Sequence, residues 1–345
     1  MALLFYIINF FMPVIKFYKL GVLKISKLPK KYLWPIIIII MISALFAYNL
    51  FRGERSQLFT VATGSPGGVY YPLGGAMAEV ISRNLEGVRC DSESTGGSVE
   101  NVRLVGNAES DMGMVTENAA YKGSRGEYPY SRTYPIKVMF NMYPAPLHIV
   151  TVEGSGIDTI EDLAGKRVSI DAPGSGTEDM SRTVLEELGL LDQVRTINYA
   201  QQDAAAALRD GNVDAVFWNF AYPASVVMEV SATHDIKFIP LEEEHLERIT
   251  DKNPYFVSDI IPSGVYDNEK DIPVLSVNNL LIAREDMEEE LVYDLLRIIF
   301  DNLDRLIEVH DIAERIKKED AVKTSVDLHP GAIRFFQEEL DEDLN

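Results

Sequence analysis

The sequence predicts an α/β protein with a parallel sheet, preceded by a membrane segment at the N-terminus. Short runs rich in β-branched residues alternate with stretches whose apolar residues recur at helical spacing, which is typical of parallel strands joined by helices. A charge-free apolar run near the N-terminus has the length of a transmembrane helix. The 345 residues are 47% apolar and 25% charged, which excludes a disordered chain and fits roughly two domains.

The membrane segment is predicted from residues 1–52, which carry seven Lys and Arg and no Asp or Glu. The uncharged run 32–51 spans about 30 Å as a helix, enough to cross the hydrocarbon core. Lys24, Lys27, Lys30 and Lys31 lie just before this run and only Arg52 follows it closely. The positive-inside rule therefore places the acidic remainder outside the cytoplasm. A cleaved signal peptide is the alternative, but no clean A-x-A site follows. We therefore predict an uncleaved anchor helix that contacts membrane lipid.

The strands of the body are expected where short apolar runs end in turn residues. In order they are Phe59–Ala62, Val88–Ser92, Asp111–Val115, Ile136–Phe140, His148–Val152, Arg167–Ile170, Val213–Phe217, Lys237–Ile239 and Val277–Ala283. Helices are expected between them, because apolar residues recur at i, i+3 and i+4 after Pro72 and again over 178–188. A long helix is expected over 288–310.

Three loops rich in small residues each follow a predicted strand and open a predicted helix. Ligands bind at this end of strands in α/β sheets, where helix N-termini offer unpaired N–H groups to an anion. Glycine allows close approach, and hydroxyls add donors. The candidate ligand-binding residues of loop one are Gly64, Ser65, Gly68 and Tyr70; those of loop two are Ser94, Thr95, Gly96, Ser98 and Asn101; those of loop three are Ser175, Gly176 and Thr177. The Trp218 ring is a candidate for stacking on a ligand.

Other classes of site are excluded or remain open as alternatives. Loop one lacks the lysine of a phosphate loop and the G-x-G-x-x-G spacing of dinucleotide binding. We find no G-x-S-x-G or H-E-x-x-H motif, one cysteine and five scattered histidines, so we predict no enzyme, metal or cofactor. Residues 53–345 hold 25 Lys and Arg against 53 acids, which argues against nucleic-acid binding. Each loop is also compatible with a purely structural turn, and Trp218 with a core position.

Six motifs in this order resemble the TAXI-type solute receptors of tripartite ATP-independent periplasmic (TRAP) transporters. They cover about Leu58 to Phe336 and read Ala62-Thr-Gly-Ser-Pro-Gly-Gly-Val-Tyr-Tyr-Pro-Leu-Gly74, Glu93-Ser-Thr-Gly-Gly-Ser-Val-Glu-Asn101, Asp162-Leu-Ala-Gly-Lys-Arg-Val168, Pro173-Gly-Ser-Gly-Thr177, Asp210-Gly-Asn-Val-Asp-Ala215 and Leu328-His-Pro-Gly-Ala332. The chain departs from the family pattern at Val115-Thr116-Glu117-Asn118 and at Ala221, where glycine is usual. The resemblance implies that both places lie near the cleft, so Thr116 and Glu117 are further candidate ligand-binding residues.

The resemblance implies a two-lobed periplasmic-binding-protein fold of type II with a hinge. Lobe one is expected at 57–147 plus 283–345 and lobe two at 148–282. The implied ligand is a small organic acid, such as glutamate or a dicarboxylate, captured between the lobes. The implied partners are the permease subunits of a TRAP transporter. A ligand sensor acting on a membrane partner, an enzyme on the same fold and a scaffold with a vestigial cleft are the alternatives.

Overall fold

The computed structural model describes residues 41, 43 and 57–341. Nearly all of the predicted anchor helix, 32–51, therefore lies outside the described residues. No helix within the described part of the chain has the length and apolar character needed to cross a membrane. Residues 56–345 form one compact unit, the body, which carries the predicted loops.

The body is built on a mixed sheet with the strand order β2-β1-β3-β10-β4-β7-β5-β6. In chain order its strands are β1 (Gln57–Ala62), β2 (Val88–Glu93), β3 (Met112–Thr116), β4 (Ile136–Val152), β5 (Arg167–Ser169), β6 (Arg195–Ile197), β7 (Ala215–Asn219), β8 (Ile236–Phe238), β9 (Phe256–Ile261) and β10 (Ile272–Arg284). The strands β1, β2 and β3 pair in parallel, as do β5, β6 and β7. β10 runs antiparallel to β3, β4 and β9, and β4 runs antiparallel to β7 and β8.

The prediction of a parallel sheet is therefore correct for the two outer groups of strands and wrong for the centre. The long strand β4 leaves the first group and enters the second, and β10 returns in the opposite direction beside it. β4 is also one strand where the sequence predicts two. Pro144 and Pro146 suggest a break, because proline is normally depleted within sheets. Both nevertheless lie inside the pairing of β4 with β10, near a register shift at Asn279.

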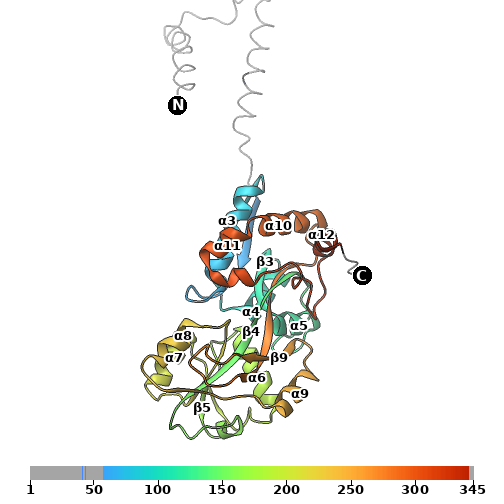
Figure 1. Ribbon diagram of the computed structural model, residues 1–345. Coiled ribbons are helices and arrows are strands. Elements are labelled where there is room, and N and C mark those ends of the chain that lie inside the picture. The colour runs from blue at the N-terminus through green and yellow to red at the C-terminus, as the bar shows by residue number, and fades with distance from the viewer. Residues whose placement is uncertain (1–40, 42, 44–56, 342–345) are drawn as a thin grey trace, which may run out of the picture. The chain divides into compact units, whose positions relative to one another are not determined.

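The helices cover the sheet on both sides of this crossing (Figure 1). They are α3 (Tyr70–Asn84), α4 (Ser98–Gly106), α5 (Glu117–Arg125), α6 (Gly176–Glu187), α7 (Gln201–Arg209), α8 (Ser225–Ser231), α9 (Glu243–Thr250), α10 (Glu289–Asp301), α11 (Leu303–Val309) and α12 (Pro330–Leu340). The predicted long helix over 288–310 is two helices. Asn302 separates them, with its side-chain amide donating to the carbonyl of Ile298 at 2.7 Å.

The buried apolar residues fall into separate cores on the two sides of the crossing. In the first part of the body, α3, α10 and α12 pack around Phe140, Phe300 and Phe336, and a smaller cluster lies under α4 and α5. In the second part, two clusters lie on opposite faces of β7, one around Phe217 and one around Trp218. Figure 1 shows β4 passing from the first part to the second. A ligand-binding site is therefore expected among the side chains that contact each other across this crossing.

Candidate functional site

Loops one and two, in the first part of the body, are tied to each other by their own polar side chains. The Ser94 hydroxyl donates to the carbonyl of Gly64 at 3.0 Å, and the Thr95 hydroxyl lies 2.6 Å from Asn101 Oδ1. The buried Asn101 amide donates to the carbonyls of Thr63 at 2.6 Å and Met114 at 2.7 Å. Asn101 therefore joins the ends of β1 and β3 and fixes the shape of loop two.

Tyr70, at the start of α3, connects loop one to the crossing strands. Its hydroxyl donates to Oδ1 of Asn279 on β10, whose amide in turn donates to the carbonyl of Tyr143 on β4 at 3.2 Å. Burial raises the pKa of Tyr70 well above its usual value, against a smaller opposite effect of the Ser98 hydroxyl. The phenol is therefore protonated at neutral pH and acts as a hydrogen-bond donor. Ser65, by contrast, is exposed in the turn that Gly68 closes by donating to the Ser65 carbonyl at 2.9 Å.

Loop three, from the second part of the body, lies directly against loop two and the end of β3. The Val99 amide donates to the Gly174 carbonyl at 3.1 Å. A Cβ placed on Gly176 would lie 2.2 Å from Thr116 Oγ1 and 2.7 Å from Ser98 Oγ. We call these contacting residues, Gly97, Ser98, Thr116, Ser175 and Gly176, the loop junction. Gly97 has φ of 111°, a conformation that favours glycine.

The hydroxyls of Ser98 and Ser175 are engaged within the protein. Ser98 Oγ accepts from the Thr116 amide at 3.0 Å, and Ser175 Oγ accepts from the Glu178 amide at 3.0 Å as the N-cap of α6. The Ala172 amide donates to Asp171 Oδ1 at 2.7 Å, and this bond together with the Thr177 and Ser175 hydroxyls counters part of the shift in the Asp171 pKa. Burial nevertheless raises the pKa of Asp171 to about 6. Loop three is therefore a pre-organised structure around a buried acid.

One polar atom of the loop junction is left without a partner. Thr116 is 5% exposed, and its Oγ1 is buried with no hydrogen bond. The neighbouring Asn118 also has a buried carbonyl oxygen, Oδ1, without a donor. Buried polar groups are nearly always hydrogen-bonded, and an unsatisfied one costs free energy. The loop junction thus holds one unsatisfied hydroxyl, and Asn118 beside it holds one unsatisfied amide oxygen.

The chain belongs to the NMT1-like family, whose model matches residues 61–339. The match covers both parts of the body and all three loops.

Solved structures share the fold of this NMT1-like protein at low sequence identity. The methylphosphonate complex of PhnD1 from Prochlorococcus marinus has a TM-score of 0.52 at 12% identity, covering 84% of this chain and 99% of that one. A binding protein component of an ABC phosphonate transporter from Pseudomonas aeruginosa has a TM-score of 0.51 at 11% identity, covering 76% and 80%. A Bordetella bronchiseptica RB50 protein has a TM-score of 0.50 at 17% identity, covering 84% and 99%. These likenesses confirm the predicted α/β periplasmic-binding-protein fold.

The structure places two of the predicted site residues in other surroundings. The buried Glu117 carboxylate accepts from Asn278 Nδ2 at 2.8 Å, from Thr324 Oγ1 at 3.0 Å and from the Ser325 amide. Trp218 is fully buried in one core of the second part. In this NMT1-like chain, both side chains therefore have a structural role, Glu117 as a hydrogen-bond acceptor and Trp218 as part of a core.

Four polar residues around the loops are absent from the sequence prediction: Asn118, Asp171, Asp179 and Asn279. Asp171 opens loop three and Asn118 lies two residues after Thr116, so their positions were available as a signal. Asp179 lies two residues after Thr177 in the same way. Asn279 had no such signal, because only folding brings it to the loops. Among the described residues, no group of three or more His, Cys, Asp or Glu is placed to hold a metal ion.

Proposed function

We propose that this chain is an extracytoplasmic solute receptor that captures a small organic acid between two lobes. The first part of the body is lobe one, 57–147 plus 283–345, and the second is lobe two, 148–282. β4 and β10 form the hinge. The separate cores on the two sides of the crossing support this division. Closure buries the ligand, and the closed state is what a membrane partner recognises.

The observation that carries this proposal is the unpartnered Thr116 hydroxyl at the loop junction. The junction combines the N-termini of α4 and α6 with the end of β3. First-turn N–H groups of helices lack intrahelical acceptors and favour an anion. Proteins of the same fold are named for phosphonate binding and transport, which supports an anionic ligand here. The resemblance to TAXI-type receptors supports a carboxylate, such as glutamate or a dicarboxylate.

The partners follow from the same resemblance and from the N-terminal sequence. The ligand is delivered to the permease subunits of a TRAP-type transporter. The run 32–51 anchors the receptor in the membrane, with the body on the periplasmic or extracellular side. The lysines before this run support that orientation.

Melting of the full chain in detergent with a panel of organic acids tests the proposal. The panel contains glutamate, succinate and 2-oxoglutarate, with methylphosphonate as another anion and glucose as a neutral control. A ligand at about 100 times its Kd stabilises the bound state by about 2.7 kcal/mol, which raises Tm by several degrees. We expect at least one carboxylate to do so. The proposal is contradicted when no acid in the panel shifts Tm at millimolar concentration.

A further inference from the structure

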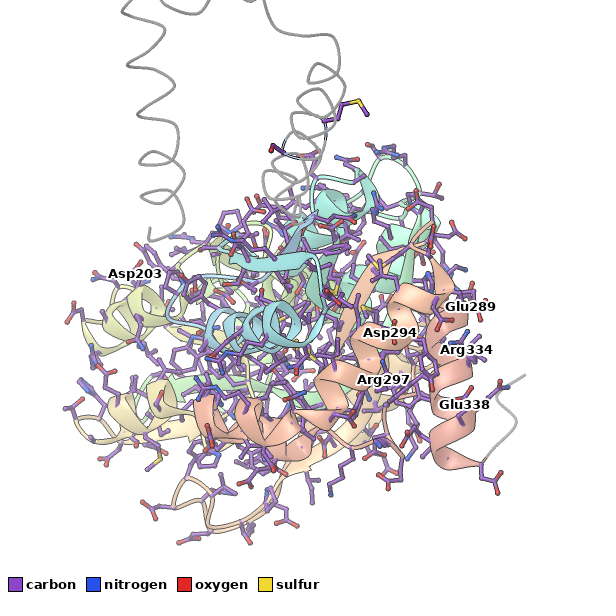
Figure 2. The ribbon with its side chains drawn as sticks, turned by 90° about the horizontal axis from the view of Figure 1, so that it is seen from above. Asp203, Glu289, Asp294, Arg297, Arg334 and Glu338 are labelled. Carbon is purple, nitrogen blue, oxygen red and sulfur yellow. The ribbon has the colours of Figure 1, made fainter. Side chains whose placement is uncertain are left out.

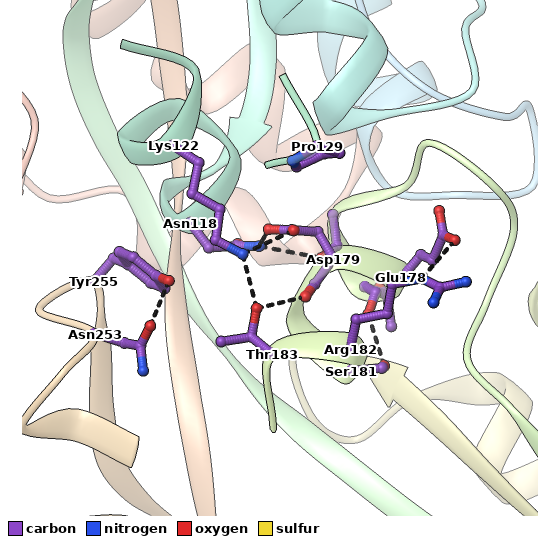
Figure 3. Close-up of polar contacts among 12 residues, drawn as sticks. Asn118, Lys122, Pro129, Glu178, Asp179, Ser181, Arg182, Thr183, Asn253 and Tyr255 are labelled. Atoms are coloured by element: carbon purple, nitrogen blue, oxygen red, sulfur yellow. Dashed lines mark hydrogen bonds and ion pairs between the residues drawn. The ribbon is translucent and has the colours of Figure 1, made fainter. Parts of the chain in front are cut away.

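Helix α5 of lobe one docks on α6 of lobe two through a buried ion pair (Figure 3). Lys122 Nζ lies 2.8 Å from Asp179 Oδ1, and the two side chains are only 10% and 4% exposed. The other ion pairs of α6, Arg182–Glu178 and Lys252–Glu187, join residues of lobe two only and are more exposed. The Lys122–Asp179 pair is thus the charged contact of α6 that crosses between the lobes.

Both charges are surrounded by further polar and aromatic partners. Asp179 Oδ2 accepts from Asn118 Nδ2 at 2.6 Å, and Lys122 Nζ donates to Thr183 Oγ1 at 2.7 Å. Tyr255 of lobe two places its ring centre 5.9 Å from Lys122 Nζ and 5.0 Å from the ring centre of Tyr121 on α5. The lobe-two residues Asp179, Thr183 and Tyr255 therefore receive the lobe-one residues Asn118, Tyr121 and Lys122.

The charges of this pair are buried only while α5 lies against α6. When the lobes separate, water solvates both, so the desolvation cost and the mutual attraction largely offset each other. When one partner is removed, the other charge is buried without compensation in the closed state, whereas water solvates it in the open state. Opening the lobes relieves that cost. The pair is thus placed to set the equilibrium between open and closed states.

We propose that Asn118, Lys122, Asp179 and Thr183 form a charge-matched contact, called the latch, that lets the lobes close before any ligand binds because each buried charge is compensated by its partner across the lobes. The latch rests on the two-lobe organisation of the proposed function, but it requires no ligand. It makes the ligand-free receptor partly closed, and it makes the ligand a stabiliser of an existing state. Apparent affinity then depends on the latch as well as on direct ligand contacts.

Spin labels on the two lobes of the full chain test the latch without ligand. Asp203→Cys on α7 and Arg297→Cys on α10 give exposed positions on different lobes, which Figure 2 shows well apart. Cys90 is buried, which raises the pKa of its thiol to about 12, so it does not compete for the label. Pulsed dipolar spectroscopy in detergent then reports the populations of open and closed lobes.

Three variants and a control separate the latch from ordinary loss of stability. Lys122→Met and Asp179→Asn each leave one buried charge unpaired, and we expect each to raise the ratio of open to closed lobes at least tenfold. The double variant contains neither charge and should return to a mostly closed distribution. Lys252→Met removes an exposed pair within lobe two, with Glu187 at 2.7 Å, and should match the parent protein.

The latch is overturned when both single variants keep the parent distance distribution, or when the double variant is as open as the singles. Circular dichroism confirms that each variant is folded before its distances are compared. The distances are measured without ligand, so a failed ligand screen leaves this result unaffected. An unchanged distribution combined with a positive screen would overturn the latch alone.

Discussion

Asp171 keeps a carboxyl group inside the protein at the first position of loop three. It is 5% exposed and has φ of 75°, a left-handed conformation that Asp and Asn tolerate better than most residues. Burial raises its pKa to about 6. The ionised carboxylate is therefore disfavoured in the folded state. The loss of folding free energy that it causes is absent below about pH 4 and complete above about pH 6.

We predict that Asp171→Asn stabilises the protein only when the parent carboxyl is ionised. Asn fits the left-handed backbone and keeps an acceptor oxygen. Two pKa units correspond to about 3 kcal/mol, so the variant should gain up to that amount at pH 8 and almost nothing at pH 4. Urea denaturation at both pH values measures the difference. An equal difference at pH 4 and pH 8 would show that the carboxyl does not carry this cost.

His148 of β4 also makes folding stability depend on pH in this range, but in the opposite direction to Asp171. Its Nδ1 donates to the Pro146 carbonyl at 3.0 Å, and its Nε2 lies 3.0 Å from the Tyr266 hydroxyl. Burial lowers the pKa of His148 to about 4. Stability from this neutral imidazole is full above about pH 6.5 and is lost as pH falls toward 4. The comparison of Asp171→Asn with the parent removes this contribution, because both proteins contain His148.

Residue types predicted the loops well but predicted individual contacts poorly. Glycine and hydroxyl residues after a strand mark loops one to three, and the structure brings loops two and three together. The sequence cannot show that Ser98 uses its hydroxyl internally, or that Asn101 ties β1 to β3. Those contacts depend on partners 13 to 38 positions away. The ligand-binding role of these residues stays a prediction.

At the scale of elements, the approach of α6 to β3 depends on the absence of a side chain at Gly176. A Cβ there would lie 2.2 Å from Thr116 Oγ1, a distance that real Cβ atoms do not adopt. Gly176 is the first residue of α6, where alanine is acceptable to the helix itself. The substitution therefore acts on closure and leaves lobe two intact.

We predict that Gly176→Ala weakens binding of the organic acid that raises Tm most by tenfold or more. The added methyl group holds loop three away from Thr116 and Ser98, so the lobes cannot close fully. Gly67→Ala is the matched control, since a Cβ at this exposed glycine has no atom within 4 Å. Titration calorimetry compares the two variants with the parent protein. Equal affinities of Gly176→Ala and Gly67→Ala would show that this approach is irrelevant to binding.

The elements themselves were predictable where periodicity is local. The spacing after Pro72 gives α3, and the spacing over 178–188 gives α6. Strands β6 and β9 were missed; β6 has only three residues, and four of the six residues of β9 are exposed or half-buried. The antiparallel centre of the sheet was missed because strand direction is set by tertiary pairing, which periodicity does not record.

For the whole molecule, charge is divided unevenly along the sequence. Residues 1–52 have a net charge of +7 and the remainder has −28. Surface ion pairs such as Arg334–Glu289 and Arg297–Asp294 (Figure 2) neutralise part of the negative charge around α10 and α12. The lysines before residues 32–51 remain the basis for placing the body outside the cytoplasm.

We predict that protease added to intact cells digests the body while the protein sediments with membranes. The positive-inside rule holds the N-terminal side in the cytoplasm, and the uncleaved run 32–51 retains the chain in the bilayer. Immunodetection of the body after fractionation gives the result. A cytosolic protein protected from protease contradicts the topology. A soluble exported form beginning near Tyr48 contradicts the anchor alone.

The measurement that tests the central claim most directly is the affinity of Thr116→Val for the acid that raises Tm most. Valine keeps the shape of threonine, and the lost hydroxyl has no partner in the protein. The ligand-free variant should therefore melt at the parent temperature or slightly above it. A hydrogen bond to a charged ligand contributes roughly 1.5–3 kcal/mol, so calorimetry should show binding weakened about tenfold or more. Unchanged affinity would contradict a ligand site at the loop junction.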